Sequence, residues 1–123
     1  MREELIRAAL SARENAYVPY SGYAVGAALL TEDGEIVAGC NVENASFGAT
    51  NCAERTAVFK AVSQGKRRFR AIAIAGGEKG KEPVDYAYPC GICRQVMNEF
   101  AAEDFQVIVA RSTADYQEYC LDK

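Results

Sequence analysis

The chain contains 123 residues, a length typical of one domain, so we expect residues 1–123 to form a single domain. Lys and Arg total 14 and Asp and Glu total 17, which gives a formal net charge of −3. This acidic balance provides no broad cationic surface for a phosphate backbone and argues against a nucleic-acid partner. The chain has no histidine, which excludes catalytic and metal-binding schemes built on imidazole.

The sequence shows no targeting or membrane signal. Residues 1–7 alternate charged and apolar side chains and do not follow the order of a secretory leader. No run approaches the roughly 20 apolar residues that a membrane-spanning helix needs. We therefore expect a cytoplasmic protein with no membrane partner. Its five cysteines are an odd number, so we expect reduced thiols, which more often bind metal or take part in redox chemistry than form disulfides.

The first third of the chain has the periodicity of a helix followed by a β-hairpin. Apolar residues recur at helical spacing over residues 2–15. Two short apolar runs, residues 24–30 and 36–41, are separated by a segment in which Asp33-Gly34 is a strong tight-turn pair. This pattern predicts a hairpin.

The remainder of the chain alternates helices and strands. The predicted helices cover residues 52–62 and 91–102, and the predicted buried strands cover residues 71–75 and 105–110. After Ser112 the chain is polar, with spaced apolar residues that indicate a short edge strand. Residues 76–88 form the longest stretch without helical or strand periodicity. Its length is near that at which loops tend to be functional.

Three cysteines lie at the predicted starts of two helices. Cys90 and Cys93 are separated by two residues, so both fall on one face of a first turn, where unpaired amides favour thiolates. Cys52 opens the other helix, with Asn51 in the capping position. Three protein ligands and one open position characterise a catalytic zinc site, whereas a structural site normally has four protein ligands. We therefore predict a catalytic zinc site at Cys52, Cys90 and Cys93.

Glu54 is the candidate proton carrier of this site. It follows Cys52 by two residues, and on a continuous helix such neighbours point about 200° apart. The two side chains converge only if Cys52 occupies the helix entrance. In that arrangement the carboxylate can accept a proton from a zinc-activated water and pass it on. The alternative is a capping-box pair of Asn51 with Glu54, which have the required spacing of three.

Two other interpretations of the cysteines stay open. CGIC at residues 90–93 resembles a redox pair, although its place at the start of the last helix, with a third thiol at another helix start, favours metal. A structural zinc module without catalysis, closed by Cys40 as a fourth ligand, is the second hypothesis. Cys40 and Cys120 lie in strand-like runs without a partner at ligand spacing, so we expect both to be small buried apolar residues.

Several blocks of the sequence are similar to the zinc nucleoside deaminases, whose pattern pairs a ligand-x-Glu motif with P-C-x-x-C. CAER at 52–55 and PCGICRQ at 89–95 match that pattern, with cysteine in place of histidine. YVPYSGYAVGAALL at 17–30 and GCNVEN at 39–44 resemble the small three-cysteine cytidine deaminases. The resemblance runs from about residue 5 to 110. It implies an α/β, three-layer fold with a mixed sheet of about five strands and helices on both faces, which agrees with the predicted order of elements.

The resemblance also implies roles for individual residues. Cys52, Cys90 and Cys93 would bind one Zn²⁺ per subunit, and Glu54 would move protons from water to the ring N3 and then to the departing amine. Four residues would contact the nucleoside: Asn41 and Glu43 at the ribose hydroxyls, Tyr23 near the pyrimidine where relatives usually have Phe, and the backbone amide of Ala53 at the base carbonyl. Arg55 would donate hydrogen bonds to the ligand sulfurs and offset their excess negative charge.

The activity implied is the hydrolysis of cytidine and 2′-deoxycytidine to uridine and 2′-deoxyuridine plus ammonia, a reaction of pyrimidine salvage. A modified or antibiotic nucleoside is an alternative substrate. Relatives form a homotetramer in which a segment beyond the last strand, ending in an aromatic residue, reaches a neighbouring active site. The sequence stops at Lys123, so we expect the C-terminal segment to be short relative to the family.

Overall fold

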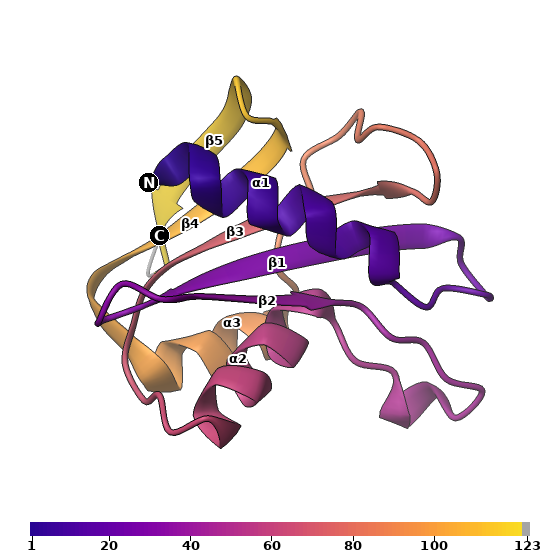
Figure 1. The fold of residues 1–123 in the computed structure, drawn as a ribbon. Helices are drawn as coiled ribbons and strands as arrows, with labels where there is room; N and C mark the ends of the chain where they lie inside the picture. The colour runs from indigo at the N-terminus through magenta and orange to yellow at the C-terminus, as the bar shows by residue number, and fades with distance from the viewer. Residues whose placement is uncertain (122–123) are drawn as a thin grey trace.

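The computed structural model describes residues 1–121 as three layers, with a central sheet between one helix above and two helices below (Figure 1). The helices are α1 (Arg2–Ala12), α2 (Ala53–Ser63) and α3 (Gly91–Phe100), with 3₁₀ turns η1 (Arg13–Asn15) and η2 (Phe47–Ala49). The strands are β1 (Tyr23–Thr31), β2 (Ile36–Cys40), β3 (Phe69–Glu78), β4 (Ala101–Ser112) and β5 (Asp115–Cys120). None of the helices in this part of the chain is long and apolar enough to cross a membrane.

The five strands form one mixed sheet in the order β2-β1-β3-β4-β5. β1 is antiparallel to both of its neighbours, β4 is parallel to β3, and β5 is antiparallel to β4. The parallel pair requires a crossover, which α3 provides. The predicted mixed sheet with helices on both faces is therefore confirmed.

Both faces of the sheet are buried, because side chains along a strand alternate between them. In β1, Ala27 and Leu29 face the cluster packed under α2 and α3, whereas Ala28 and Leu30 face the cluster packed under α1. This two-sided burial explains why the central strands appear in the sequence as continuous apolar runs rather than as alternating ones.

Two glycines let the helices approach the sheet closely. A Cβ atom added at Gly26 would lie 1.9 Å from the carbonyl oxygen of Ala9 in α1, and one added at Gly39 would lie 2.6 Å from the backbone nitrogen of Ala57 in α2. Real Cβ atoms do not approach backbone so closely, so only glycine fits at either position. Gly39 thereby fixes how near α2 lies to β2.

Several predicted boundaries differ from the structure. The predicted 2–15 helix is α1 followed by the separate turn η1, and the last helix ends at Phe100, where the chain passes directly into β4. β3 continues to Glu78, beyond the predicted end at residue 75, because it pairs with β1 as far as Tyr23. Gly76 and Gly77 obscure this extension in the sequence, since glycine is depleted in strands.

The Gly26→Ala variant should lose stability because the added methyl group collides with the backbone of α1. We expect the free energy of unfolding to fall by about 1–3 kcal/mol, the usual cost of overpacking. Urea denaturation followed by circular dichroism measures this change. Gly48→Ala is the control, because a Cβ at residue 48 meets nothing within 4 Å. Equal midpoints for the two variants would contradict the assigned contact.

Candidate active site

The start of α2 and the start of α3 place three thiols next to one another. Cys52 directly precedes α2 and Cys90 directly precedes α3, each with an extended backbone, and Cys93 lies in the first turn of α3. The two helices pack side by side under the sheet (Figure 1). Cys52 therefore occupies the helix entrance, which is the condition for Cys52 and Glu54 to converge.

The three sulfur atoms all lie within 4.8 Å of one another. The Sγ atoms of Cys90 and Cys93 are 3.3 Å apart, and the backbone amide of Cys93 donates to Cys90 Sγ at 3.5 Å. Cys93 is buried, Cys52 is half-buried and Cys90 is exposed. Sulfur donors converging from two helix starts form a donor set that zinc accepts, since each Zn–S bond is about 2.3 Å long.

Arg55 supplies positive charge to the sulfur cluster. Its Nη2 donates to Cys52 Sγ at 3.3 Å, and its Nε is buried without a partner among the described residues. The hydrogen bond from the Cys93 thiol, together with the nearby Arg55 guanidinium, lowers the pKa of Cys52 to about 5 despite its partial burial. The hydrogen bond to Cys52 and burial raise the pKa of Cys93. One member of the cluster is thus readily ionised even without a metal.

Glu54 is a buried carboxyl group beside the cluster, with a relative exposure of 4%. Burial raises the pKa of Glu54 to about 7. The prediction that Asn51 caps α2 is wrong, because the helix begins after Cys52 and no side chain caps it. The Asn51 amide instead donates to Thr56 Oγ1 at 3.1 Å. The capping box of Asn51 with Glu54 is therefore not formed.

A cavity of about 310 Å³ opens beside the thiols and the buried carboxyl group. Six predicted site residues lie in its wall: Tyr23, Asn41, Cys52, Ala53, Glu54 and Cys90. Val25 and Ile74 of the sheet complete the apolar part of the wall. The cavity therefore combines sulfur donors, a buried carboxyl group and an apolar surface.

Asn41 and Glu43 are held in different ways. The Asn41 amide accepts from the Val25 backbone nitrogen and donates to the Tyr23 carbonyl, both at 2.9 Å, so its position in the cavity wall is fixed by β1. Glu43 lies outside that wall and accepts hydrogen bonds from the backbone amides of Tyr20 and Ser21. The hydrogen bond from the Ser21 hydroxyl lowers the pKa of Glu43.

Three further wall residues were not identified in the sequence. Tyr86, Ala87 and Tyr88 come from the loop between β3 and α3 and close one side of the cavity. This segment has neither helical nor strand periodicity, so only its place directly before Pro89 and Cys90 connects it with the site.

Cys40 and Cys120 do not join the sulfur cluster. Cys40 ends β2 and packs near Ala16 and Ala24, and Cys120 ends β5 and accepts a hydrogen bond from Gln106. Among residues 1–121, the one group of potential metal ligands contains the three predicted cysteines and no fourth member. This arrangement does not favour the closed structural site that Cys40 was considered to complete.

Comparison with known proteins agrees with this geometry. The family model of the cytidine and deoxycytidylate deaminase zinc-binding region matches residues 1–109. A cytidine deaminase of Halalkalibacterium halodurans is 52% identical over 117 residues, which cover 95% of this chain and 85% of that protein. A cytidine deaminase of Sporosarcina psychrophila is 50% identical over 121 residues, which cover 98% of this chain and 85% of that protein.

A crystal structure of a cytidine deaminase from Burkholderia pseudomallei superposes with a TM-score of 0.87 and 46% identity. The match covers 98% of this chain and 93% of that chain. Family model, relatives and fold thus agree over nearly the whole sequence, and the chain belongs to the cytidine and deoxycytidylate deaminase family of zinc-binding proteins.

Proposed function

We propose that the protein is a zinc-dependent hydrolase that deaminates cytidine and 2′-deoxycytidine to uridine and 2′-deoxyuridine, releasing ammonia. The observation that carries this proposal is the cavity in which converging cysteines meet a buried carboxyl group at the starts of two helices. Membership of the deaminase family indicates the class of reaction. The apolar wall and the fixed Asn41 amide suit a pyrimidine nucleoside in that cavity.

Cys52, Cys90 and Cys93 would hold one zinc ion per chain. Bound there, zinc would supply a Lewis acid that makes water nucleophilic near neutral pH. The negative charge of three thiolates exceeds the positive charge of the dication by one. This surplus negative charge would weaken the ability of zinc to acidify water. The Arg55 guanidinium, in contact with Cys52 Sγ, offsets the surplus charge.

Glu54 is the residue to which we assign proton transfer. Its carboxyl group faces the same cavity as Cys52 and Cys90 and is shielded from bulk water. Glu54 would take a proton from the attacking water and give it to the ring N3. It would then take the second proton from the hydroxyl group newly bonded to C4 and deliver it to the leaving amine. The C4–N bond breaks, ammonia departs and the carbonyl of uridine forms.

The remaining site residues would orient the nucleoside. Asn41 presents an amide held by β1, and Tyr23 supplies an aromatic ring beside it. The backbone amide of Ala53 lies at the start of α2, where donors are unpaired and suit a carbonyl acceptor. Glu43 joins the 20–21 backbone to the segment that carries Asn41, and we assign it to the ribose side of the site.

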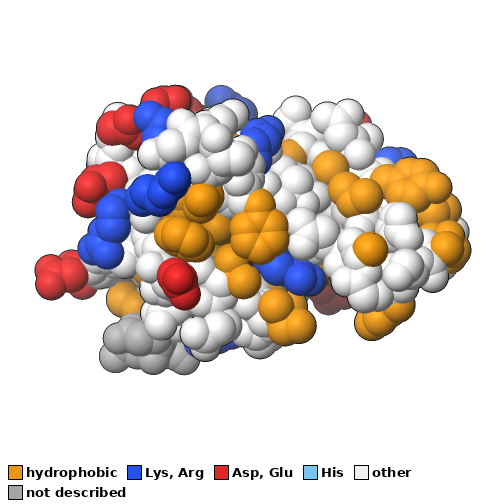
Figure 2. Space-filling model, turned by 90° about the horizontal axis from the view of Figure 1, so that it is seen from below, with side chains coloured by type: hydrophobic (Ala, Val, Ile, Leu, Met, Phe, Trp, Pro, Cys, Tyr) orange, Lys and Arg blue, Asp and Glu red, His pale blue; other side chains and the backbone are white. Residues whose placement is uncertain are grey.

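We further propose that the protein assembles as a homotetramer. Phe47 is 89% exposed, and Tyr17, Tyr20 and Val42 are also exposed. Hydrophobic side chains gather over the end of the molecule occupied by residues 41–52, on the side of α2 and α3 (Figure 2). Apolar patches on a surface mark interaction sites. Sedimentation equilibrium distinguishes a tetramer from smaller species.

A reducing compartment suits the sulfur cluster, since the five cysteines are free thiols and the site needs three of them unoxidised. We therefore place the enzyme in the cytoplasm, where its product would enter pyrimidine salvage.

An ultraviolet assay of the purified protein tests the proposed function when zinc is measured on the same sample. Cytidine and 2′-deoxycytidine should both be converted. Free cytosine should react poorly, because it lacks the sugar that Asn41 and Glu43 are expected to hold. No turnover of either nucleoside by zinc-loaded protein would overturn the proposal.

Replacing Glu54 should separate proton transfer from metal binding. We expect Glu54→Gln to keep its zinc and to lose about 10²–10⁴-fold in kcat, the usual contribution of a positioned acid–base group. Atomic absorption and the cytidine assay provide the two measurements. Glu99→Gln on the exposed face of α3 is the control. Cytidine turnover by Glu54→Gln at the wild-type rate would contradict the role assigned to Glu54.

Removal of one sulfur from the cluster should abolish stable metal binding. We expect Cys93→Ser to contain almost no zinc after dialysis, because one of the three protein ligands is replaced by a poorer donor. Cys120→Ser should keep one zinc per chain, since Cys120 lies at the end of β5 outside the cluster. Equal zinc contents in the two variants would contradict the ligand set.

Arg55→Gln should weaken the site without removing a ligand. We expect zinc affinity or kcat to fall about 10- to 100-fold, the range found when residues that support metal ligands are replaced. Competition with a chromogenic chelator measures the zinc affinity. Lys60→Gln removes an exposed positive charge from the same helix and should change neither quantity. An unchanged Arg55→Gln variant would refute the assigned charge compensation.

A further inference from the structure

The loop that closes the cavity is held in place by side chains. Within residues 1–121, the backbone of residues 82–89 forms no hydrogen bond with other backbone groups. A segment of this kind has little intrinsic resistance to local opening. Tyr86, Ala87 and Tyr88 nevertheless have to occupy defined positions, since they line the cavity. Contacts made by side chains must therefore fix this wall.

The β4–β5 hairpin supplies those contacts. The Tyr86 hydroxyl donates to Asp115 Oδ1 at 2.5 Å. Arg111 donates to the other oxygen of Asp115, with Nε at 2.9 Å, and its guanidinium lies 4.5 Å from the centre of the Tyr86 ring. Arg111 Nη1 also donates to the Val84 carbonyl at 3.1 Å. Arg111 and Asp115 thus contact both the backbone and the aromatic side chain of the loop.

Electrostatic effects agree with these contacts. The hydrogen bond to Asp115 raises the pKa of Tyr86, and the hydrogen bonds from Tyr86 and then from Arg111 lower the pKa of Asp115. The Tyr88 hydroxyl makes a further hydrogen bond to Gln117 of β5. Both tyrosines of the loop are therefore attached to β5.

Gly76 of β3 allows the loop to lie directly against the sheet. A Cβ atom at Gly76 would lie 2.9 Å from Ala87 Cβ and 3.1 Å from Tyr23 Cε2. The absence of that atom lets the loop rest directly on the sheet beside Tyr23. The wall is thus confined between β3 and the side chains of β4 and β5.

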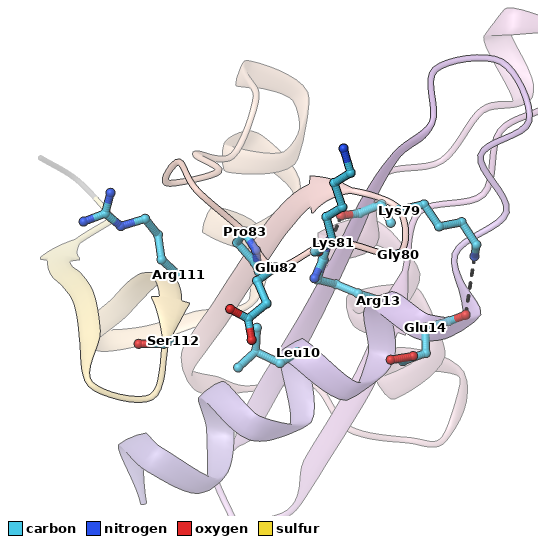
Figure 3. Close-up of a pocket in the computed structure, with 11 residues that line it drawn as sticks. Leu10, Arg13, Glu14, Lys79, Gly80, Lys81, Glu82, Pro83, Arg111 and Ser112 are labelled. Carbon is cyan, nitrogen blue, oxygen red and sulfur yellow. Dashed lines mark hydrogen bonds between the residues drawn. The ribbon is translucent and has the colours of Figure 1, made fainter.

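The two ends of the loop are held independently. Arg13 donates to the carbonyls of Glu78 and Lys81 and fixes the end nearest β3. Figure 3 shows Arg13 and Arg111 on opposite sides of the loop residues Lys81, Glu82 and Pro83, around a cavity of about 480 Å³. Loss of the contacts to Asp115 therefore frees the Tyr86 side chain in the cavity-lining part of the loop and leaves the end held by Arg13 attached.

We propose that Arg111 and Asp115 are positioning residues, which hold Tyr86 and the adjoining backbone in the place from which they close the nucleoside cavity. This inference rests on the proposed function, because the cavity is the one assigned to the nucleoside. Neither residue lines the cavity, so both act through the loop. Their loss should weaken nucleoside binding and leave proton transfer by Glu54 unaffected.

Three variants and one control test this inference in the full-length, zinc-loaded protein. Asp115→Ala removes the acceptor of the Tyr86 hydroxyl, Asp115→Asn keeps an acceptor oxygen, and Tyr86→Phe removes the hydroxyl but keeps the ring. Glu118→Ala is the matched control, since its side chain belongs to the same strand but pairs with Arg2 of α1 rather than with the loop. We expect Asp115→Ala to raise KM for cytidine about two- to tenfold, as for the loss of one hydrogen bond, with kcat within about twofold.

Tyr86→Phe should raise KM by a similar factor, and Asp115→Asn should restore KM to within about twofold of the wild type. The dissociation constant of uridine, measured by titration calorimetry, should follow KM. Hydrogen exchange in the peptide covering residues 79–88 should be faster in Asp115→Ala than in Glu118→Ala. Equal exchange in these two variants, or faster exchange with unchanged KM and uridine affinity, would overturn the proposal.

The same measurements separate failure of this inference from failure of the proposed function. If the wild type neither converts cytidine nor binds uridine, the proposed function falls, and with it the effect of the loop on nucleoside binding. Faster exchange in Asp115→Ala would in that case still support the attachment of the loop to β5.

Discussion

The close approach of α2 and α3 beneath one end of the sheet is the constraint on which the site depends. Small residues along α2, including Ala53, Ala57 and Ala61, are fully buried against the sheet, and Gly39 removes the side chain that would keep the helix away. Because α2 and α3 then lie side by side, their first turns meet. A shift of either helix along its axis by one residue, about 1.5 Å, would separate sulfur atoms that now lie within 4.8 Å.

The meeting of two helix starts also shapes the electrostatics of the site. Both helices direct unpaired amides and the positive end of their dipoles toward the thiols, which favours the ionised form of sulfur. Arg55 adds a full positive charge in contact with Cys52. Glu54 lies in the same turn but is buried, so its environment favours the neutral form. The start of α2 therefore carries a thiol whose pKa is lowered and a carboxyl group whose pKa is raised to about 7.

Much of this arrangement could be predicted from the sequence, because its signals are local. Apolar periodicity predicted the order of helices and strands, and the spacing of Cys90 and Cys93 placed both thiols on one face at a predicted helix start. The prediction that Asn51 caps α2 was wrong because the helix begins at Ala53, so Cys52 takes the capping position and the Asn51 amide donates to Thr56 instead. The wall formed by Tyr86 could not be predicted, since it depends on Asp115, a residue 29 positions away that binds no ligand itself.

The order of these parts along the chain bears on how the enzyme is made. The last thiol of the cluster is Cys93, yet α3 buries Cys93 and Met97 against Phe105 and other residues of β4. During synthesis, all three cysteines are therefore present in the chain before β4, against which Cys93 is buried, has left the ribosome. β4 follows Cys93 in the chain, and Asp115, which follows β4, emerges later still. A nascent chain at that stage presents unprotected thiols, so reductant in the surrounding medium protects the protein before its own fold does.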